Sequence, residues 1–442
     1  MPLHIHIGTA LYHLGVRVAA PFLPKARQWI NGRKGLWERL DKKANALTGC
    51  LWMHCASVGE FEQGRPFLEA IRAKQPDLPI LITFFSPSGF EAVKNTPLAT
   101  HVEYLPPDSA ANAERFLCSV RPSMAIFVRY EFWYDHLMTL EKAQVPSFLL
   151  SAIFRPSQPF FQWYGGAHKA MLQTFERIFV QEQASLELLR GIGIKNVVVS
   201  GDTRFDRVAE IAATNAVLPL AEAYRKAEFR PVIVAGSTWP ADDALLLEAM
   251  EQLTNKARVI VAPHELSTGS LAKIATSYPI PVAVWSELES ELERQGPAGR
   301  STNDAPDDDP LNARTLLVDR MGLLSRLYKY GDITYVGGGF GSGIHSLLEA
   351  AAWGKPVIFG PHHGSFAEAK GLIEVGAGFE VKNAKELVAV LQHLLNDPKA
   401  LETASKAASE YVQARTGATQ RALTGIQDVL RGTTSSPTRT PA

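Results

Sequence analysis

One carboxylate of this chain stands where it could remove a proton from a reacting hydroxyl group. An apolar run, residues 51–55, is followed by a loop of small residues that includes Ser57 and Gly59, and Glu60 then begins an amphipathic stretch. Small residues let a ligand approach the amides of a helix N-terminus, and a carboxylate beside them could act as a general base. A glutamate in a first helical turn also complements the helix dipole, and the spacing alone leaves both interpretations open.

A glycine-rich loop in the second half of the chain suits a phosphate group. Residues 336–343 read Val-Gly-Gly-Gly-Phe-Gly-Ser-Gly, and Gly338, Gly339 and Gly341 could expose backbone amides to such a group. The loop comes late in its half of the chain, unlike the G-x-G-x-x-G sequence that opens a dinucleotide-binding unit, which argues against a dehydrogenase. Glu349 follows in a helical stretch and is either a partner for ribose hydroxyls or a surface glutamate.

Three other loops in the second half also follow apolar runs and carry polar or aromatic residues. They are Ser237-Thr238-Trp239-Pro240, Pro263-His264-Glu265 and Gly360-Pro361-His362-His363-Gly364. Each could contact a ligand, but a serine or threonine there could equally be a helix N-cap, and a histidine a hydrogen-bonded turn residue. The paired histidines suggest zinc, yet neither a cysteine nor an acidic residue lies near them in sequence. We therefore expect no metal and no other cofactor.

The elements that must position these loops are short apolar runs alternating with helical stretches, a pattern that predicts parallel β/α units. In the first half one more such loop, Ser86-Pro87-Ser88-Gly89, is either a plain turn with an N-cap or a ligand contact. Ligand sites of such sheets lie at the carboxyl ends of the strands. The expected strands are residues 51–55, 80–84, 102–105, 124–128, 147–150, 178–180 and 197–199, then 232–235, 258–262, 282–285, 315–318, 333–336, 357–359 and 378–381.

The two series of strands predict an α/β fold with two Rossmann-like, doubly wound domains. We place the N-terminal domain at residues 46–212 and the C-terminal domain at 213–431, interrupted by a polar, mobile insertion at 296–312. Three consecutive aspartates in that insertion are not preorganised for a metal ion. Residues 432–442 are expected to form a disordered tail.

The composition is that of a folded protein without an affinity for nucleic acid. The 442 residues include 45 basic and 45 acidic side chains, so no net positive field would attract nucleic acid. The three cysteines form no disulfide pattern, and we expect them to be buried in a reducing compartment. Residues 1–45 combine an apolar stretch, too short and polar for a confident spanning helix, with a basic run. This segment is predicted to associate with a membrane surface, although an ordinary packed amphipathic helix is the alternative.

Taken in order, these loops resemble those of the 3-deoxy-D-manno-octulosonic acid (Kdo) transferases, a family of GT-B glycosyltransferases of lipopolysaccharide core synthesis. The N-terminal domain of that family carries His-x-Ala-Ser-Val-Gly-Glu, which residues 54–60 match. The resemblance covers roughly residues 36–381. Its other matching segments include Ser86-Pro87-Ser88-Gly89, Gly201-Asp202-Thr203-Arg204-Phe205-Asp206, Asp319-Arg320-Met321-Gly322 and Gly354-Lys355-Pro356-Val357.

The resemblance implies two domains facing a cleft, and an inverting, metal-independent transfer of Kdo from CMP-Kdo to a lipid A precursor at the cytoplasmic face of the inner membrane. Glu60 is then the catalytic base. The residues expected to bind the donor in the C-terminal domain are Ser237, Thr238, His264, Gly338, Gly339, Gly341, His345, Glu349 and Pro361. Those expected to bind the acceptor in the N-terminal domain are Ser57, Gly59, Ser86, Ser88, Gly89, Glu131 and Arg155.

The chain departs from the family at several of these positions. The usual Glu-Thr-Glu-Leu-Trp-Pro is here Arg129-Tyr130-Glu131-Phe132-Trp133-Tyr134, so that only the second glutamate remains. The usual Asn-Ala-Arg is Ser151-Ala152-Ile153, with Arg155 nearby, and a His-Asn pair is His345-Ser346. These changes predict a modified acceptor. The rival interpretations are a nucleotide-sugar epimerase of the same architecture and a non-catalytic lipid-binding relative.

Overall fold

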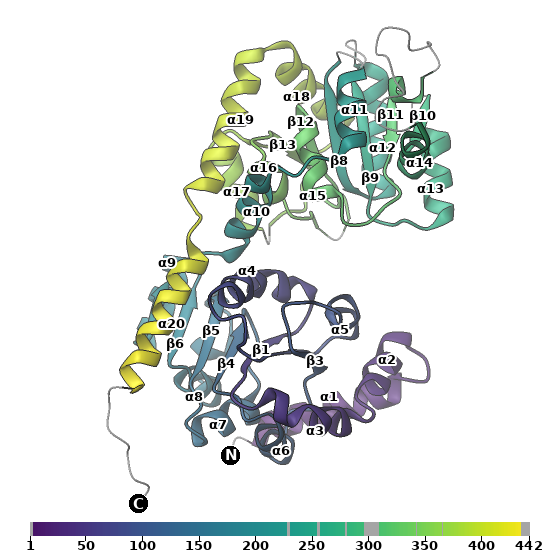
Figure 1. Ribbon diagram of the computed structural model, residues 1–442. Coiled ribbons are helices and arrows are strands. Elements are labelled where there is room, and N and C mark those ends of the chain that lie inside the picture. The colour runs from purple at the N-terminus through teal and green to yellow at the C-terminus, as the bar shows by residue number, and fades with distance from the viewer. Residues whose placement is uncertain are drawn as a thin grey trace, which may run out of the picture. The chain divides into compact units, whose positions relative to one another are not determined.

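The computed structural model describes residues 3–227, 230–253, 257–278, 281–295, 309–341, 343–364 and 366–434. The expected mobile insertion therefore lies outside the described residues except for 309–312, and so does the expected tail beyond residue 434. The chain forms two compact units, each with its own sheet (Figure 1). The N-terminal unit consists of residues 1–206 and 416–442, and the C-terminal unit of residues 207–415.

The N-terminal unit is a parallel sheet covered by helices on both faces. Its strands are β1 (Leu51–Cys55), β2 (Ile80–Phe84), β3 (His101–Tyr104), β4 (Met124–Val128), β5 (Ser147–Ala152), β6 (Arg177–Val180) and β7 (Val197–Val199). Its helices are α1 (Leu3–Ala19), α2 (Pro24–Gly32), α3 (Leu36–Leu47), α4 (Val58–Lys74), α5 (Pro87–Val93), α6 (Ala110–Val120), α7 (Tyr134–Lys142), η1 (Pro159–Phe161), α8 (Gly166–Gln173), α9 (Gln183–Gly191) and α20 (Ala418–Thr434), and α10 (Thr203–Thr214) leads into the other unit.

The C-terminal unit repeats this plan. Its strands are β8 (Val232–Thr238), β9 (Arg258–Pro263), β10 (Val282–Val284), β11 (Thr315–Leu317), β12 (Ile333–Val336), β13 (Val357–Phe359) and β14 (Gly378–Glu380). Its helices are α11 (Pro219–Ala227), α12 (Pro240–Gln252), α13 (Thr268–Ser277), α14 (Trp285–Gln295), η2 (Pro310–Asn312), α15 (Leu324–Leu327), η3 (Tyr328–Tyr330), α16 (Leu348–Ala352), α17 (Ala367–Glu374), α18 (Ala384–Asn396) and α19 (Pro398–Gln413).

The strand order of each sheet reverses at one point, and that point determines where a site can form. The N-terminal sheet runs β3-β2-β1-β4-β5-β6-β7, and the other runs β10-β11-β9-β8-β12-β13-β14. The order reverses between β1 and β4 in the first sheet and between β8 and β12 in the second. In open parallel sheets ligands bind beside the carboxyl ends of the strands at such a point. The loops after these four strands are therefore the first places to examine.

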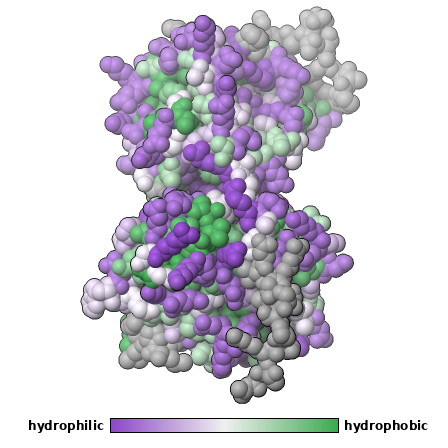
Figure 2. Space-filling view, turned by 90° about the vertical axis from the view of Figure 1, so that its left-hand side faces the viewer, coloured by the Kyte–Doolittle hydropathy of each residue, from purple (hydrophilic) through white to green (hydrophobic). Residues whose placement is uncertain are grey.

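The expected strands coincide with those of the structure, because parallel strands covered on both faces are continuous apolar runs. All five residues of β1 and of β2 are buried, for example. The predicted fold class of two Rossmann-like α/β domains is confirmed. On the face shown in Figure 2 most surface residues are hydrophilic, and hydrophobic ones gather in smaller patches. One expectation is wrong: Cys50 and Cys55 are buried, but Cys118 is exposed because it lies opposite the buried face of α6.

Helix α20 packs on the N-terminal unit, although the sequence boundaries grouped most of it with the C-terminal domain. Its apolar side chains Ala422, Leu423 and Ile426 are buried in a cluster with Phe179 of β6. Asp206, at the start of α10, accepts hydrogen bonds from the amides of Gly417 and Thr419 just before and within α20. The last helix of the chain thus returns to the first sheet.

Candidate functional site

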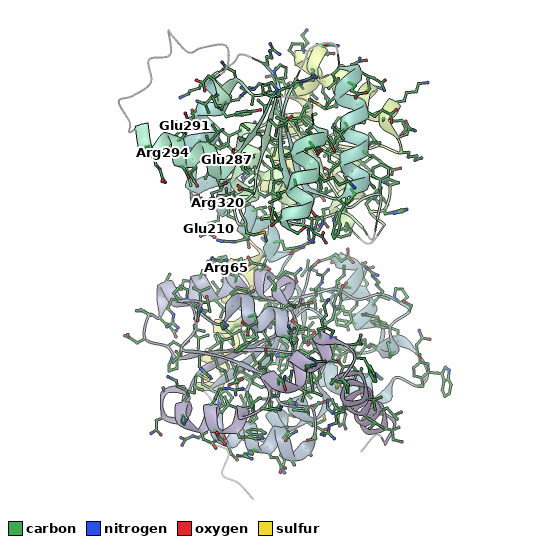
Figure 3. The ribbon with its side chains drawn as sticks, turned by 90° about the vertical axis from the view of Figure 1, so that its right-hand side faces the viewer. Arg65, Glu210, Glu287, Glu291, Arg294 and Arg320 are labelled. Carbon is green, nitrogen blue, oxygen red and sulfur yellow. The ribbon has the colours of Figure 1, made fainter. Side chains whose placement is uncertain are left out.

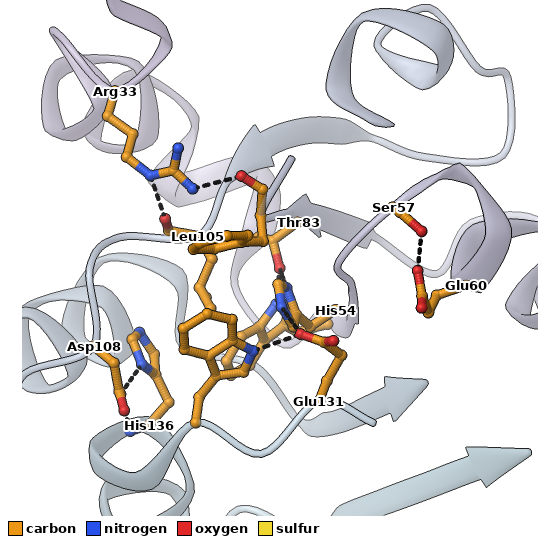
Figure 4. Close-up of polar contacts among 12 residues, drawn as sticks. Arg33, His54, Ser57, Glu60, Thr83, Leu105, Asp108, Glu131 and His136 are labelled. Atoms are coloured by element: carbon orange, nitrogen blue, oxygen red, sulfur yellow. Dashed lines mark hydrogen bonds and ion pairs between the residues drawn. The ribbon is translucent and has the colours of Figure 1, made fainter. Parts of the chain in front are cut away.

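Glu60 lies at the reversal point of the N-terminal sheet, in the first turn of α4. Ser57 is the N-cap of this helix and Glu60 its third residue, a spacing typical of a capping box. The Ser57 side chain makes no cap hydrogen bond, however, and its hydroxyl donates instead to the Glu60 carboxylate (Figure 4). Glu60 is half-buried and Gly59 is exposed. The glutamate is therefore not used to satisfy the helix N-terminus.

A buried polar network lies beside Glu60, at the ends of β1, β2 and β4. The His54 ring bonds through Nδ1 to Thr83 Oγ1 at 2.9 Å and through Nε2 to Glu131 at 3.1 Å. The indole groups of Trp52 and Trp133 donate to Thr83 and to Glu131, each at 2.8 Å. Because an indole can only donate, these contacts are satisfied by one proton on His54 Nε2 and by a Thr83 hydroxyl that donates to Nδ1. The carboxylate of Glu131 thus accepts two hydrogen bonds (Figure 4).

The two carboxylates influence the same neighbouring thiol. Burial, followed by the negative charges of Glu60 and Glu131, raises the pKa of the Cys55 thiol well above its usual range. Both charges are therefore close to the end of β1. The raised pKa keeps Cys55 protonated, and it is a packing residue rather than a nucleophile.

Arg129 follows β4 directly and is held in a strained conformation. Its φ is +67°, a left-handed value that is uncommon for a residue other than glycine. Its Nε atom is buried without a hydrogen-bond partner, while its guanidinium lies over the Tyr130 ring at 4.9 Å. Ser151, at the end of the adjacent β5, also has a positive φ of +53°. Such strain tends to persist where a site requires it.

The other residues expected to bind the acceptor have more local roles. Ser86 is the N-cap of α5, and its hydroxyl oxygen accepts a hydrogen bond from the amide of Gly89 at 3.0 Å. The Ser88 hydroxyl donates to the same oxygen at 3.5 Å. A Cβ atom on Gly89 would come within 2.6 Å of the Phe84 ring, so packing requires the glycine. The amide of Ser86 donates to Ala56 at 2.8 Å, which joins the loops after β1 and β2. Arg155 is exposed, and its side chain makes no contact with Glu60 or Glu131 in the described part of the chain.

A second cation, Arg33, lies half-buried at the same edge and pairs with no carboxylate of the described residues. Its guanidinium donates to the carbonyl oxygens of Leu105, Trp29 and Phe85 at 2.9 to 3.2 Å and lies 3.8 Å over the Trp29 ring. Burial lowers the pKa of Arg33 to about 9. The Phe85 ring also packs against Trp133, with ring centroids 5.0 Å apart, which brings Arg33 near the buried network.

In the C-terminal unit Asp242 joins the loops that meet at the reversal point. It is 1% exposed, and its carboxylate accepts from the amides of Trp239 at 2.9 Å and Gly338 at 2.8 Å and from the Tyr335 hydroxyl at 2.8 Å. Burial, followed by the charge of Asp242, raises the pKa of Tyr335, so its hydroxyl stays a donor. Sequence reasoning missed Asp242, because an acidic residue in a first helical turn is common. The end of β8 is also strained, with Ser237 at a φ of +53°.

The glycine loop is built by backbone contacts, and most of its amides are used inside the protein. The Gly337 amide donates to the carbonyl oxygen of Gly236, and the Gly338 amide donates to the Asp242 carboxylate. The amides of Gly341 and Gly343 both donate to the carbonyl oxygen of Gly338. Gly338 has a φ of +93°, and a Cβ on Gly339 would come within 2.6 Å of the Gly360 backbone. Gly341 has no such restriction. The amides of Gly339 and Phe340 have no bond within the described residues, so fewer donors remain for a phosphate than the sequence suggests.

Three aromatic side chains form a stack at the same edge. The His264 ring stacks on both Trp239 and His345, at centroid distances of 4.5 and 4.6 Å. The indole Nε1 of Trp239 is 3.2 Å from His345 Nε2. Thr238 is 2% exposed, and its hydroxyl has no hydrogen-bond partner in the described chain. Ser237, Thr238, His264 and His345 are thus brought to one edge of the unit.

Glu349 and the paired histidines lie around this edge as well. Glu349 is on α16, and its charge, after burial, raises the pKa of Tyr328, whose hydroxyl lies beneath Gly236. His362 Nδ1 bonds to Gly341 O at 2.9 Å, and His363 Nε2 pairs with Glu380 at 2.7 Å, so each ring has a protein partner. Pro361 is half-buried. Among the described residues no group of His, Cys, Asp and Glu could hold a metal ion.

The loop after β11 is tied to α14. Asp319 accepts from the amide and the hydroxyl of Ser286 at the helix N-terminus, and Arg320 pairs with Glu289 at 3.1 Å. Figure 3 labels Arg320 next to the α14 residues Glu287, Glu291 and Arg294. Met321 between these contacts is 80% exposed. The loop therefore presents an apolar side chain beside the carboxyl end of its strand.

The N-terminal helices expose an apolar face. The exposed apolar side chains of α1 and of the turn after it are Ile7, Leu11, Tyr12, Leu14, Val18, Phe22 and Leu23. Ring contacts of Tyr12 with Phe85 and of His13 with Trp29 attach α1 to the N-terminal unit. None of the helices in the described ranges is long and apolar enough to cross a membrane.

The sequence is similar to that of known Kdo transferases over most of its length. Residues 30–207 match the family model described as 3-deoxy-D-manno-octulosonic-acid transferase. The chain is 28% identical to the transferase of Bordetella pertussis, covering 96% of this chain and all of that protein. It is 29% identical to those of Aquifex aeolicus and Haemophilus influenzae, covering 81% and 86% of this chain and 89% and 87% of theirs. The expected resemblance is confirmed.

Solved structures of similar fold include a UDP-GlcNAc 2-epimerase from Neisseria meningitidis, with a TM-score of 0.57 at 12% identity, covering 86% of this chain and 99% of that one. Another is MurG from Acinetobacter baumannii, with a TM-score of 0.54 at 12% identity and the same coverage. At this identity the likeness concerns the fold alone. It confirms the expected GT-B class for the two α/β units.

Proposed function

Since this chain is a glycosyltransferase related to the Kdo transferase family, we propose that it transfers Kdo from CMP-Kdo to a lipid A precursor, in an inverting reaction that needs no metal ion. The observation that carries this proposal is the contrast between two neighbouring carboxylates. Glu131 already accepts from His54 and Trp133, whereas Glu60 has only the Ser57 hydroxyl as a partner among the described residues. A base needs a lone pair that is free to take a proton, and Glu60 provides one.

Glu60 would take the proton of the attacking acceptor hydroxyl. The acceptor oxygen then forms a bond to the anomeric carbon of Kdo on the face opposite CMP, and the bond between that carbon and the phosphate oxygen breaks with its electron pair leaving on CMP. Donor residues supply hydrogen bonds to the departing phosphate in place of a cation. The amides of Gly339 and Phe340, which have no bond to a described residue, and the ring of His345 are suited to this task, and Glu349 to the ribose hydroxyls.

The acceptor would be anionic and would be approached from a membrane surface. Two guanidinium groups, those of Arg33 and Arg129, lie at the edge that carries Glu60 and Glu131, and neither pairs with a carboxylate in the part of the chain that the structure describes. Guanidinium groups suit phosphates, since they offer paired donors. The exposed apolar face of α1 would insert into the interface of the inner membrane at its cytoplasmic side. Both features support a phosphorylated lipid as acceptor.

The epimerase alternative shares the fold but leaves the exposed apolar face of α1 without a use. A non-catalytic lipid-binding protein would use that face and would not need a free carboxylate. Neither alternative accounts for both features. Replacing Glu60 distinguishes a non-catalytic protein from an enzyme, and the transfer assay itself distinguishes an epimerase from a transferase.

The test is transfer from CMP-Kdo to a tetraacylated lipid A precursor, with products resolved by mass. Glu60→Gln keeps the size and the Ser57 contact but removes the base, so we expect turnover to fall at least about 100-fold while the fold is retained. The matched control is Glu62→Gln on the same helix, whose carboxylate pairs with Arg65 at the surface. Equal activity in the wild type and Glu60→Gln would refute the role of Glu60, and an inactive wild type would refute the choice of substrates.

A further inference from the structure

Trp239 occupies an unusual position in the donor half of the proposed site. It is the last residue before α12, and its amide is fixed by the buried Asp242 carboxylate at 2.9 Å. Its ring stacks on His264, which in turn stacks on His345, with interplanar angles of 23° and 25°. The indole Nε1 also reaches His345 directly, at 3.2 Å from Nε2. Two different contacts therefore connect Trp239 to His345.

The direct contact determines which nitrogen of His345 carries the proton. An indole N–H is a donor and never an acceptor, so Nε2 of His345 must present its lone pair to Trp239. In a neutral imidazole the proton then has to be on Nδ1. This atom has no hydrogen-bond partner in the described residues and is not among the buried polar atoms. His345 thus presents an N–H donor that is free for a ligand.

The surroundings favour the neutral ring. Burial, followed by the neighbouring His264, lowers the pKa of His345, and only the Asp242 carboxylate acts in the opposite direction. A proton on Nε2 would in addition face the indole N–H and break that contact. The geometry and the nearby charges therefore act on His345 in the same sense.

We propose that Trp239 is a positioning residue that holds His345 as the tautomer protonated on Nδ1, so that this N–H donates to the phosphate of the nucleotide donor. The inference rests on the proposed function in one respect, the identity of the phosphate ligand. A neutral donor stabilises the leaving phosphate without the strong attraction of an imidazolium, which would slow the release of CMP. The contact would also stay constant while the pH changes through the usual range of histidine.

The variant that tests this is Trp239→Phe, because phenylalanine keeps a ring for stacking on His264 and removes only the N–H. The first readout is the nitrogen-15 NMR spectrum of histidine-labelled full-length protein, with His345 assigned from His345→Gln. We expect wild-type His345 to carry its proton on Nδ1, and Trp239→Phe to show a new population with the proton on Nε2. A wild-type proton on Nε2 would overturn the proposal.

The second readout is calorimetric binding of the methyl ester of cytidine 5′-phosphate, a diester whose single charge does not titrate near neutral pH. At about pH 8 Trp239→Phe should weaken binding by about 2- to 10-fold, since part of the Nδ1–H donor is lost. At about pH 6 the defect should shrink or reverse, because the released Nε2 can now be protonated. The wild-type affinity should change little between these values.

The His345→Gln background separates a positioning role from a merely structural one. In that background Trp239→Phe should cause no further change in affinity. A loss that is equal at both pH values and persists in His345→Gln would contradict the proposal. If the wild type does not bind the ester at all, the donor assignment of the proposed function fails, whereas normal binding with the wrong tautomer overturns only the role of Trp239.

Discussion

Replacing Asp242 should release the loops that carry the donor residues. In Asp242→Ala two buried donors, the Gly338 amide and the Tyr335 hydroxyl, and the partly buried amide of Trp239 lose their acceptor. A buried donor without a partner costs about 1–3 kcal/mol, and because the hydroxyl can turn and water can enter the vacated space, we expect a total of about 3–6 kcal/mol. Since about 1.4 kcal/mol corresponds to a factor of ten, local opening should become at least about 100-fold more frequent.

The assay is hydrogen exchange followed by mass spectrometry of peptides covering residues 239–245 and 335–345, with CMP binding measured in parallel. Asp242→Asn is the matched control. Its amide oxygen can accept from both backbone amides while its NH2 group donates to the Tyr335 oxygen, so exchange should change much less. The reasoning is refuted if exchange in the alanine variant stays at the wild-type rate, or if the asparagine variant is equally impaired.

Two further predictions concern the N-terminal unit. Burial alone would raise the pKa of Glu103, but its bonds to Arg39 and other donors hold the pKa below the usual value. Glu103 therefore stabilises the folded state fully above about pH 4.3, the pKa of an unfolded glutamate, and this stabilisation is lost as the pH falls through the lowered pKa. Glu103→Gln should therefore lower stability at pH 7 by about 1–3 kcal/mol and flatten the acid end of a denaturation series; a parallel shift at every pH would argue against this. The double variant Leu11→Asp with Val18→Asp should reduce flotation of the protein with anionic vesicles at least about tenfold. The control Val198→Asp, at another exposed site, should not reduce it. Equal flotation of the wild type, the double variant and the control would exclude α1 as the membrane contact.

The strands and the position of the site could be predicted from the sequence, because each depends on residues close together in the chain. A run such as residues 51–55 is apolar throughout, and a loop that follows it must lie at the carboxyl edge of a parallel sheet. Ser57 and Glu60 are three residues apart, so their contact lies within the range of local sequence analysis. The helix α20 is different, since nothing in its amphipathic pattern indicates which of two sheets it will cover.

The use of each backbone amide could not be predicted in the same way. A glycine loop was expected to offer its amides to a phosphate, yet those of Gly337 and Gly338 donate within the protein. Whether an amide is free depends on acceptors elsewhere, here Gly236 and Asp242, which lie about a hundred residues earlier. The glycines instead allow the backbone to pack closely, as the approach of Gly339 to the Gly360 backbone demonstrates.

The role of Asp242 could not be predicted from its position in the sequence. An acidic residue in the first turn of a helix ordinarily complements the helix dipole at the surface, and the sequence of α12 contains nothing that contradicts this. In the structure Asp242 is only 1% exposed and three donors surround its carboxylate. A buried carboxylate requires such partners, so Asp242 holds the loops together instead of complementing the helix dipole at the surface. Trp239 likewise gains its significance only from His345, which is 106 positions away. Because the order of the sheet reverses between β8 and β12, the residues that follow these two strands meet, and this topology brings Trp239, Asp242 and His345 together.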